Sequence, residues 1–312
     1  MAVLQKGMMT KKNQLPCRAL MKPASVKLNL IIPAILASFL VTSSVSENLR
    51  TLDSPAPEKM PSHDPESRFQ LARQLLKGDG VPKDSAKALQ LFKSAADEGH
   101  PEAMGALGFF YATGLGAAKN EEVALEWFRK GAEAGGAKAQ FNYGKMLLES
   151  GDSTKAVDGI KWLESAVDQK QIDAARFLGM VHLQGRHGQP INYQKSLQYL
   201  FIAAKAGDAD AQNSLGFLYS GPYLGEENPS EAQHWFRKAA ISGNTKAQSN
   251  LGSTLWKFGE SDRQVRIEAL MWLWKAKEAG EITADKFLLD ISQKIDRVEL
   301  QEAQKMASKP VP

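Results

Sequence analysis

Short helical patterns of apolar and small residues recur along the chain between residues 65 and 281. In each pattern such side chains return every three to four residues, as in Ala103, Leu107, Gly108 and Tyr111, and a Gly-containing turn then leads to a second stretch of the same kind. This spacing places the apolar side chains on one face of a helix. The chain is therefore predicted to fold as consecutive helical hairpins.

The hairpins repeat with a period near 36 residues. Glycines separated by 36, 35, 37 and 36 residues mark the period: Gly108, Gly144, Gly179, Gly216 and Gly252. An alanine stands five residues before each glycine: Ala103, Ala139, Ala174, Ala211 and Ala247. A large residue stands in the second half of each unit: Leu91, Trp127, Trp162, Tyr199, Trp235 and Trp272. These spacings define six units, at residues 65–100, 101–136, 137–171, 172–208, 209–244 and 245–281.

The repeated residue types have a physical role in stacked hairpins. Glycine and alanine let two helices approach closely, and the large residues are expected to fill the space on the second helix. An Asx residue that can cap the second helix precedes it in four units, the third and sixth excepted: Asp84, Asn120, Asn192 and Asn228. Helices of about 12 residues are marginal alone, so each hairpin must bury its apolar face against its neighbours. Residues 282–312 hold one more helical pattern without the repeat signature, which we interpret as a capping helix and a tail.

These residues resemble a known repeat. The string Gly78-Asp79-Gly80-Val81-Pro82-Lys83-Asp84, followed by Ala88, Ala95-Ala96 and Gly99, is similar to the Sel-one-like repeat (SLR), a relative of the tetratricopeptide repeat. The resemblance covers residues 65–281 and rests on the recurrence of the pattern. It implies an all-α fold, a right-handed α-solenoid of about six SLR helix-turn-helix repeats, that serves as an adaptor surface in protein complexes. Some secreted members have a disulfide in each repeat, which this chain cannot form.

The N-terminal segment has its own composition. The chain has 39 Lys and Arg against 35 Asp and Glu, and residues 1–46 hold six of the basic residues and none of the acidic ones. The remaining 33 basic and 35 acidic residues leave the rest of the chain near neutral, which removes the electrostatic argument for nucleic-acid binding.

Residues 1–46 have the order of an export signal, with a basic stretch, the apolar run 28–41 and small residues at 43–46. Translation from Met1 or Met21 and cleavage after Ser43 or Ser46 fit this pattern. The 14-residue apolar run is short for a membrane span, which needs about 20 residues. We therefore expect an exported protein, periplasmic or secreted from a bacterium. An uncleaved N-terminal anchor and an organelle transit peptide are the alternatives.

Two observations describe the chain that follows. Residues 47–64 contain Pro55, Pro57 and Pro61 without apolar periodicity, which predicts a flexible spacer. The only cysteine, Cys17, lies within the predicted signal. A cleaved chain would therefore have no disulfide, no thiolate nucleophile and no cysteine metal site.

The sequence predicts no catalytic residue, no metal site and no cofactor. The Gly114–Lys119 turn resembles a phosphate loop, but the same Gly-x-Gly spacing at Gly78–Gly80 joins two helices, where glycines turn the chain. The five histidines have no i,i+4 pair and no cysteine companions, so no zinc pattern arises. His182 aligns with Tyr111 and Tyr219, which favours a packed core position. No carboxylate pair stands out as an acid and a base.

The candidate partner-binding site is the concave groove that the first helices would line. Residues flanking the core Leu-Gly pair are expected to point into it: Phe109, Lys138, Asn142, Arg176, Phe177, Asn213, Phe217, Lys246, Asn250 and Trp256. Amides can bind a peptide backbone, and lysines can bind a carboxylate. Each residue taken alone is also compatible with a solvated helix surface.

Other residues depart from the repeat. Phe201 and Trp274 stand where most units have a charged residue, and packing against a loop or the cap is the favoured reading over a docking site. The long turns 185–191 and 221–228 are further candidates for a specific contact.

The sequence therefore predicts a non-catalytic scaffold of the cell envelope that holds an unidentified protein or peptide partner. An envelope enzyme or enzyme regulator that acts on peptide or cell-wall fragments is the alternative, and an array that only spaces components apart is a third hypothesis.

Overall fold

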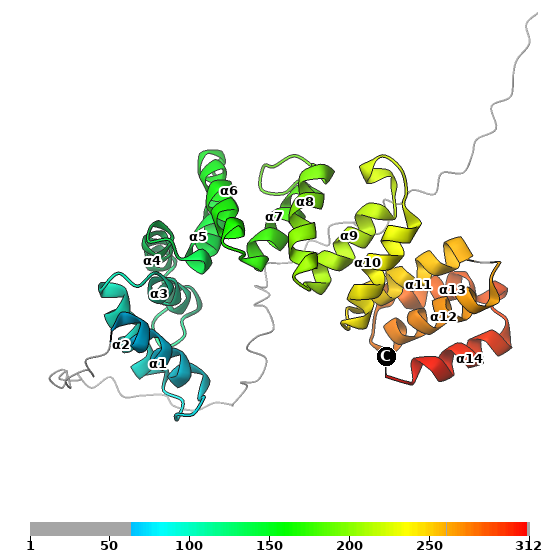
Figure 1. Ribbon diagram of the computed structural model, residues 1–312, viewed down its shortest axis with the longest axis horizontal. Coiled ribbons are helices and arrows are strands. Elements are labelled where there is room, and N and C mark those ends of the chain that lie inside the picture. Colours follow the sequence, from blue (N-terminus) through cyan, green and yellow to red (C-terminus); the bar gives the residue numbers. More distant parts are fainter. Residues whose placement is uncertain (1–63, 260, 311–312) are drawn as a thin grey trace, which may run out of the picture. The chain divides into compact units, whose positions relative to one another are not determined.

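The computed structural model describes residues 64–259 and 261–310, which form helices joined by short turns (Figure 1). The first helices are α1 (Pro65–Lys77), α3 (Pro101–Thr113), α5 (Ala137–Glu149), α7 (Ile172–Gln184), α9 (Ala209–Tyr219) and α11 (Thr245–Gly259). The second helices are α2 (Ser85–Asp97), α4 (Glu121–Glu133), α6 (Ser153–Asp168), α8 (Tyr193–Lys205), α10 (Pro229–Ile241) and α12 (Arg263–Glu278). We number the hairpins 1 to 6, from α1–α2 to α11–α12. Each second helix packs on its own first helix and on the next one, which confirms the predicted all-α solenoid.

Polar side chains cap the second helix of every hairpin. The four predicted Asx residues each accept a hydrogen bond from the backbone N–H three residues later. Hairpins 3 and 6 also have such a cap, contrary to the sequence prediction. Asp152 and Asp262 accept bonds from the N–H groups two and three residues later. The turns before them are shorter, and the helices that they begin have 16 residues instead of 13.

The repeated glycines lie where the two helices of a hairpin touch. A Cβ added at Gly108 would lie 2.5 Å from Phe128 Cδ1, and one at Gly179 would lie 2.6 Å from Leu200 Cγ. The residue that fills each contact is therefore the one directly after the predicted large residue. These residues are Phe128, Leu163, Leu200, Phe236 and Leu273. One residue turns a helix by about 100°, so the large residues themselves face a different neighbour.

Side chains at or next to the large residues of the last three hairpins join neighbouring second helices. Glu164 of α6 contacts Tyr199 of α8, Phe201 of α8 contacts Trp235 of α10, and Arg237 of α10 contacts Glu268 of α12. Glu268 also accepts a hydrogen bond from Trp272 on its own helix. The Tyr199 hydroxyl donates to Glu164 Oε1 at 2.7 Å, and the Phe201 ring meets the Trp235 ring edge-on with centroids 5.8 Å apart. Phe201 is thus one side of a junction, which accounts for a hydrophobic residue at that position.

First helices approach one another in two pairs of neighbouring hairpins. Their backbones meet between α3 and α5 and between α7 and α9, whereas the second helices of the described hairpins make no comparable backbone approach. The first helices therefore lie on the more closely packed side of the stack. We call the surface that the first helices present on this side the inner face. It consists of four positions in each first helix: six, three and two residues before the repeat glycine, and one residue after it.

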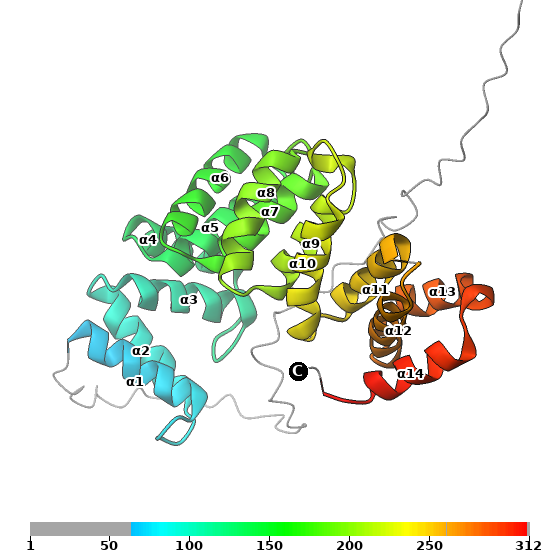
Figure 2. The same cartoon turned by 45° about the vertical axis from the view of Figure 1, so that its right-hand side comes forward.

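Past hairpin 6 the chain forms two helices where the sequence predicts one. Helix α13 (Ile282–Asp290) packs on α11 and α12, and α14 (Arg297–Ala307) lies along α12 and covers it (Figure 2). The buried carboxylate of Glu299 on α14 accepts from Arg266 Nη2 at 2.5 Å and from its Nε at 3.0 Å. Trp274 packs against this end of the core, and its Nε1 donates to Glu278.

Candidate functional site

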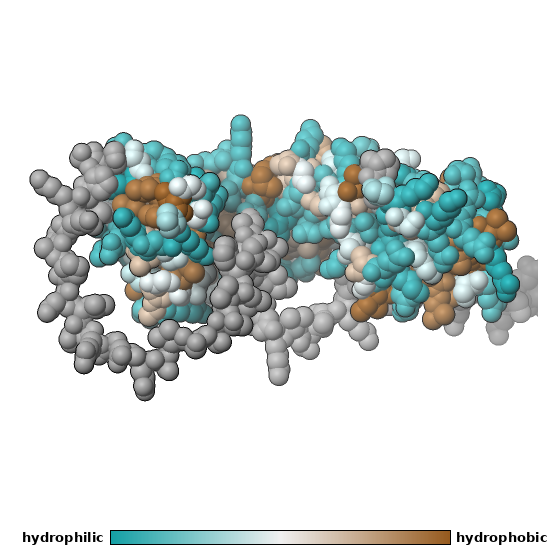
Figure 3. All heavy atoms as spheres, turned by 90° about the horizontal axis from the view of Figure 1, so that it is seen from below, coloured by the Kyte–Doolittle hydropathy of each residue, from teal (hydrophilic) through white to brown (hydrophobic). Residues whose placement is uncertain are grey.

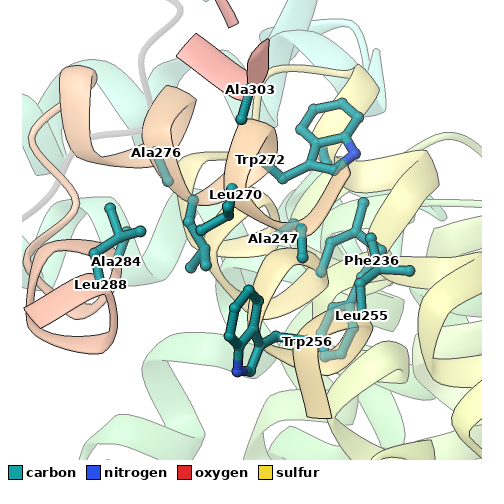
Figure 4. Packing of buried hydrophobic residues seen from close by; sticks show 14 of the residues in the cluster. Phe236, Ala247, Leu255, Trp256, Leu270, Trp272, Ala276, Ala284, Leu288 and Ala303 are labelled. Atoms are coloured by element: carbon teal, nitrogen blue, oxygen red, sulfur yellow. The ribbon is translucent and has the colours of Figure 1, made fainter. Parts of the chain in front are cut away.

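Nine of the ten predicted partner-binding residues lie on accessible surface of the first helices. Lys138 and Lys246 are exposed. The half-buried ones are Phe109, Asn142, Arg176, Phe177, Asn213, Phe217 and Asn250. Trp256 is the exception, because it is only 4% exposed and lies in the core with Phe236 and Leu255 (Figure 4). It stands four residues after the repeat glycine, where hairpins 3 and 4 have a buried leucine, so the prediction that it faces a groove is wrong.

The structure brings two predicted asparagines together. Asn250 Nδ2 on α11 donates to Asn213 Oδ1 on α9 at 2.9 Å. The two amides come from successive hairpins but hold different repeat positions, because Asn213 stands three residues before Gly216 and Asn250 stands two residues before Gly252. This bond uses one donor and one acceptor, and it leaves the Nδ2 of Asn213 and the Oδ1 of Asn250 for another molecule. The pair offers what one residue of an extended segment needs, an acceptor for its N–H and a donor for its own carbonyl.

Arg176 ties neighbouring hairpins together. Its Nη2 lies 2.9 Å from Asp173 Oδ1 on the same helix, and its Nε lies 3.0 Å from Asp208 Oδ2. The other oxygen of Asp208 caps α9 by accepting from Ala211 N at 2.8 Å. Two carboxylates neutralise this guanidinium, so its main contribution is to the stack.

Phe177 is the centre of an aromatic cluster on α5, α7 and the long turn after α7. Phe141 meets it edge-on with ring centroids 6.3 Å apart, and His187 lies 6.1 Å away. Lys145 Nζ lies 5.8 Å from the Phe177 centroid, within the range of a cation–π contact. Burial lowers the pKa of His187. The turn after α7 therefore folds back onto Phe177 and places the His187 ring beside it.

Phe217 is covered in the same way by the long turn after α9. The Tyr223 ring stacks on Phe217 with centroids 4.8 Å apart, and Tyr193 packs on Tyr223 at 5.1 Å. Glu227 of the same turn pairs with Lys257 of α11 at 3.3 Å. This turn therefore links hairpins 4, 5 and 6.

Phe141, Lys145 and Tyr223 were not predicted as part of the site. The repeat register does contain a signal for Lys145, because it follows Gly144 as Phe109 follows Gly108. Tyr223 lies in the long turn 221–228, which the sequence marks as a candidate for a contact by its length, although the repeat register does not single out this residue.

His182 is a core residue, as its alignment with tyrosines predicts. It is 3% exposed and stacks on Tyr199 with ring centroids 5.9 Å apart and an interplanar angle of 11°. Burial is the main cause that lowers the pKa of His182. Burial and the bond to Glu164 raise the pKa of the Tyr199 phenol.

The part of the chain that the structure describes contains neither a cluster of metal ligands nor a membrane-spanning helix. No group of three or more His, Cys, Asp or Glu residues there is arranged to hold a metal ion. None of the helices at 64–259 and 261–310 is long and apolar enough to cross a membrane. The face in Figure 3 is mainly hydrophilic, with separate hydrophobic patches.

A family model described as the Sel1 repeat matches residues 65–100, 101–136, 137–170, 172–208, 209–244 and 245–281. A protective antigen of uropathogenic Escherichia coli with an SLR fold is similar to this chain with a TM-score of 0.66 at 25% identity, over 78% of this chain and 52% of that one. A Sel1 repeat protein from Oxalobacter formigenes has a TM-score of 0.60 at 29% identity, over 69% of this chain and 88% of that one.

Longer proteins also contain similar segments. An uncharacterized protein of Neisseria meningitidis serogroup B is 30% identical over 172 residues, 55% of this chain and 36% of that protein. Chitin synthase regulatory factor 3 of Schizosaccharomyces pombe is 27% identical over 237 residues, 72% of this chain and 25% of that protein. The chain spans about a quarter to a third of the length of these relatives.

Proposed function

The chain belongs to the Sel1 repeat family, and we propose that it is a non-catalytic adaptor that holds an extended segment of a partner protein on its inner face. The observation that carries this proposal is the bond between Asn213 and Asn250. It fixes two amides from neighbouring hairpins and leaves the Nδ2 of Asn213 and the Oδ1 of Asn250 for a ligand. The N–H and C=O of one residue in an extended segment satisfy both, whatever the side chain of that residue.

Side chains around the amide pair would select the segment. Lys246 is exposed on the same helix as Asn250, and Lys138 stands at the same repeat position in hairpin 3. These lysines favour acidic groups of the partner. The half-buried rings of Phe109 and Phe177 offer apolar contacts to its hydrophobic residues.

We place this adaptor in the cell envelope because of the export pattern at residues 1–46, which lie outside the described residues. Cell fractionation with N-terminal sequencing tests this part. A cleaved chain in the periplasm or medium supports export, and an intact leader on cytoplasmic protein contradicts it.

The alternative is an enzyme or enzyme regulator that acts on peptide or cell-wall fragments. One relative is named as a regulatory factor of chitin synthase, which favours regulation by binding over catalysis in this alternative. A catalytic role requires turnover that one carboxylate or histidine substitution abolishes.

The inner-face assignment is tested by photo-crosslinking in cells followed by mass spectrometry. A photoreactive residue in place of Lys246 should capture a partner, and one in place of Gln198 on the second helix α8 should not. The double variant Asn213→Ala with Asn250→Ala should weaken binding of that partner by about 2 kcal/mol, roughly thirtyfold, because two hydrogen bonds are lost. Gln198→Ala is the matched control. Undiminished capture by the folded double variant would show that the partner binds elsewhere.

A further inference from the structure

Helix α13 is the first helix of a seventh hairpin. Its capping residue Glu281 accepts from Thr283 N and stands 37 residues after Asn244, which caps α11 by accepting from Ala247 N. Ala284 stands 37 residues after Ala247, and both are fully buried. The same register places Leu289 at the position of the repeat glycine. The hairpin pattern thus continues for one helix beyond the last match to the family.

No helix of the described structure packs on α13 as the second helix of this seventh hairpin would. Helix α14 lies on α12 instead and makes no backbone approach to α13 on the scale of the pairs within hairpins 1 to 6. In hairpin 6 a Cβ at Gly252 would lie 2.6 Å from Leu273 Cγ of the second helix. In α13, Leu289 is 73% exposed and Ile282 is 79% exposed. No other large hydrophobic residue in the described chain is as exposed as these two.

The open face of α13 has a self-complementary order of residues. Ile282, Asp285, Lys286 and Leu289 share one side of the helix, opposite the buried Ala284. In an antiparallel pair with a two-fold axis between positions 285 and 286, Ile282 meets Leu289 of the second copy. Asp285 then meets Lys286 of the second copy. A two-fold interface requires such a match of one patch with itself.

We propose that a second copy of this chain covers this face, with α13 packed antiparallel on α13 of the second copy. The charge order favours a second copy over an unrelated helix, because each apolar contact and each opposite charge is already supplied by the same nine residues. Asp285 already pairs with Lys277 of α12 at 2.6 Å, but its side chain is 62% exposed and therefore accessible to Lys286 of the second copy. An interface of one short helix is small, so the dimer forms at high concentration and dissociates on dilution.

Sedimentation of the full chain over a range of concentrations tests the dimer. Leu289→Lys should raise the dissociation constant by at least about tenfold, because a charge replaces the apolar contact. Val157→Lys, at a 54% exposed residue of α6, is the matched control and should leave it unchanged. Lys286→Glu should weaken the dimer, and adding Asp285→Lys should restore it. A chain that stays monomeric, or a dimer that Leu289→Lys leaves intact, overturns the proposal.

Cross-linking tests the antiparallel order. In a Cys17→Ser background, Ile282→Cys with Leu289→Cys should give a covalent dimer on oxidation. These positions are about 10 Å apart along one helix, so a disulfide within one chain is excluded. The single variant Leu289→Cys should cross-link poorly, because the two copies of this residue lie at opposite ends of the interface. Equal yields from the single and double variants would overturn the antiparallel arrangement.

Discussion

Lys170 has a backbone conformation that the other hairpins assign to glycine, and replacing it should stabilise the array. Its φ is 63°, and the equivalent residues are Gly99, Gly135, Gly207, Gly243 and Gly280, with φ between 84° and 94°. Lys170 N donates to Val167 O at 2.8 Å, as Gly207 N donates to Ala204 O at 3.0 Å. The turn is therefore the same, and only the side chain differs.

The expected gain follows from two opposing terms. A non-glycine residue in the left-handed region costs roughly 1–2 kcal/mol, and glycine costs about 0.5–1 kcal/mol through its freedom in the unfolded chain. Lys170→Gly should therefore raise the free energy of unfolding by about 0.5–1 kcal/mol. Urea denaturation measures this gain, and calorimetry should show a rise of about 2 °C in the melting temperature.

Two variants separate the backbone from the charge. Lys170→Ala removes the charge but retains a Cβ, so it should give little of the gain. Gly207→Lys should destabilise by a similar amount, and a Cβ there meets no atom within 4 Å that would add a steric clash. A gain from Lys170→Ala equal to that from Lys170→Gly, or an unchanged stability of Gly207→Lys, would refute the reasoning.

Three further predictions concern the core, the pH response and the cap. Gly108→Ala should destabilise by about 1–3 kcal/mol in urea denaturation, because the new Cβ would lie 2.5 Å from Phe128, whereas Gly105→Ala on the same helix meets only ordinary contacts and should be tolerated. Burial lowers the pKa of His182 below its usual 6.5, so the unfolded chain binds the proton more readily and stability falls as the pH drops through 6.5. His182→Leu should flatten this dependence in urea titrations, and an unchanged slope would contradict it. Glu299→Ala should speed hydrogen exchange in α14 while the exchange of α3 stays unchanged, because it leaves an α12 guanidinium without its buried partner.

The spacing of glycine and alanine predicts the hairpins because close helix approach restricts residue size at a few fixed positions. It predicts less well which neighbour a bulky residue faces. Trp127 and Phe128 are adjacent in sequence but point about 100° apart, and only the packed helices show that Phe128 covers Gly108. The caps Asp152 and Asp262 follow shortened turns, so an alignment on fixed spacing misses them.

The surface positions of most candidate residues were predictable from the sequence, but their contacts were not. Asn213 and Asn250 stand at different offsets from their glycines, so their bond depends on how α9 and α11 stack. Trp256 has the size and polarity of a ligand-binding residue, yet its offset belongs to the core in hairpins 3 and 4 as well, where Leu148 and Leu183 are buried.

The second-helix junctions differ in chemistry along the array. Glu164 meets a phenol, Phe201 meets an indole, and Arg237 meets a carboxylate. Loss of hairpin 5 through recombination between repeats would bring Phe201 to the Trp272 end of α12, where Trp272 is the counterpart of Trp235, and would leave Glu268 without its guanidinium. The hairpins share one pattern but are not interchangeable, so evolution by repeat loss or gain is constrained at these joints, and point substitution is the easier route to a new surface.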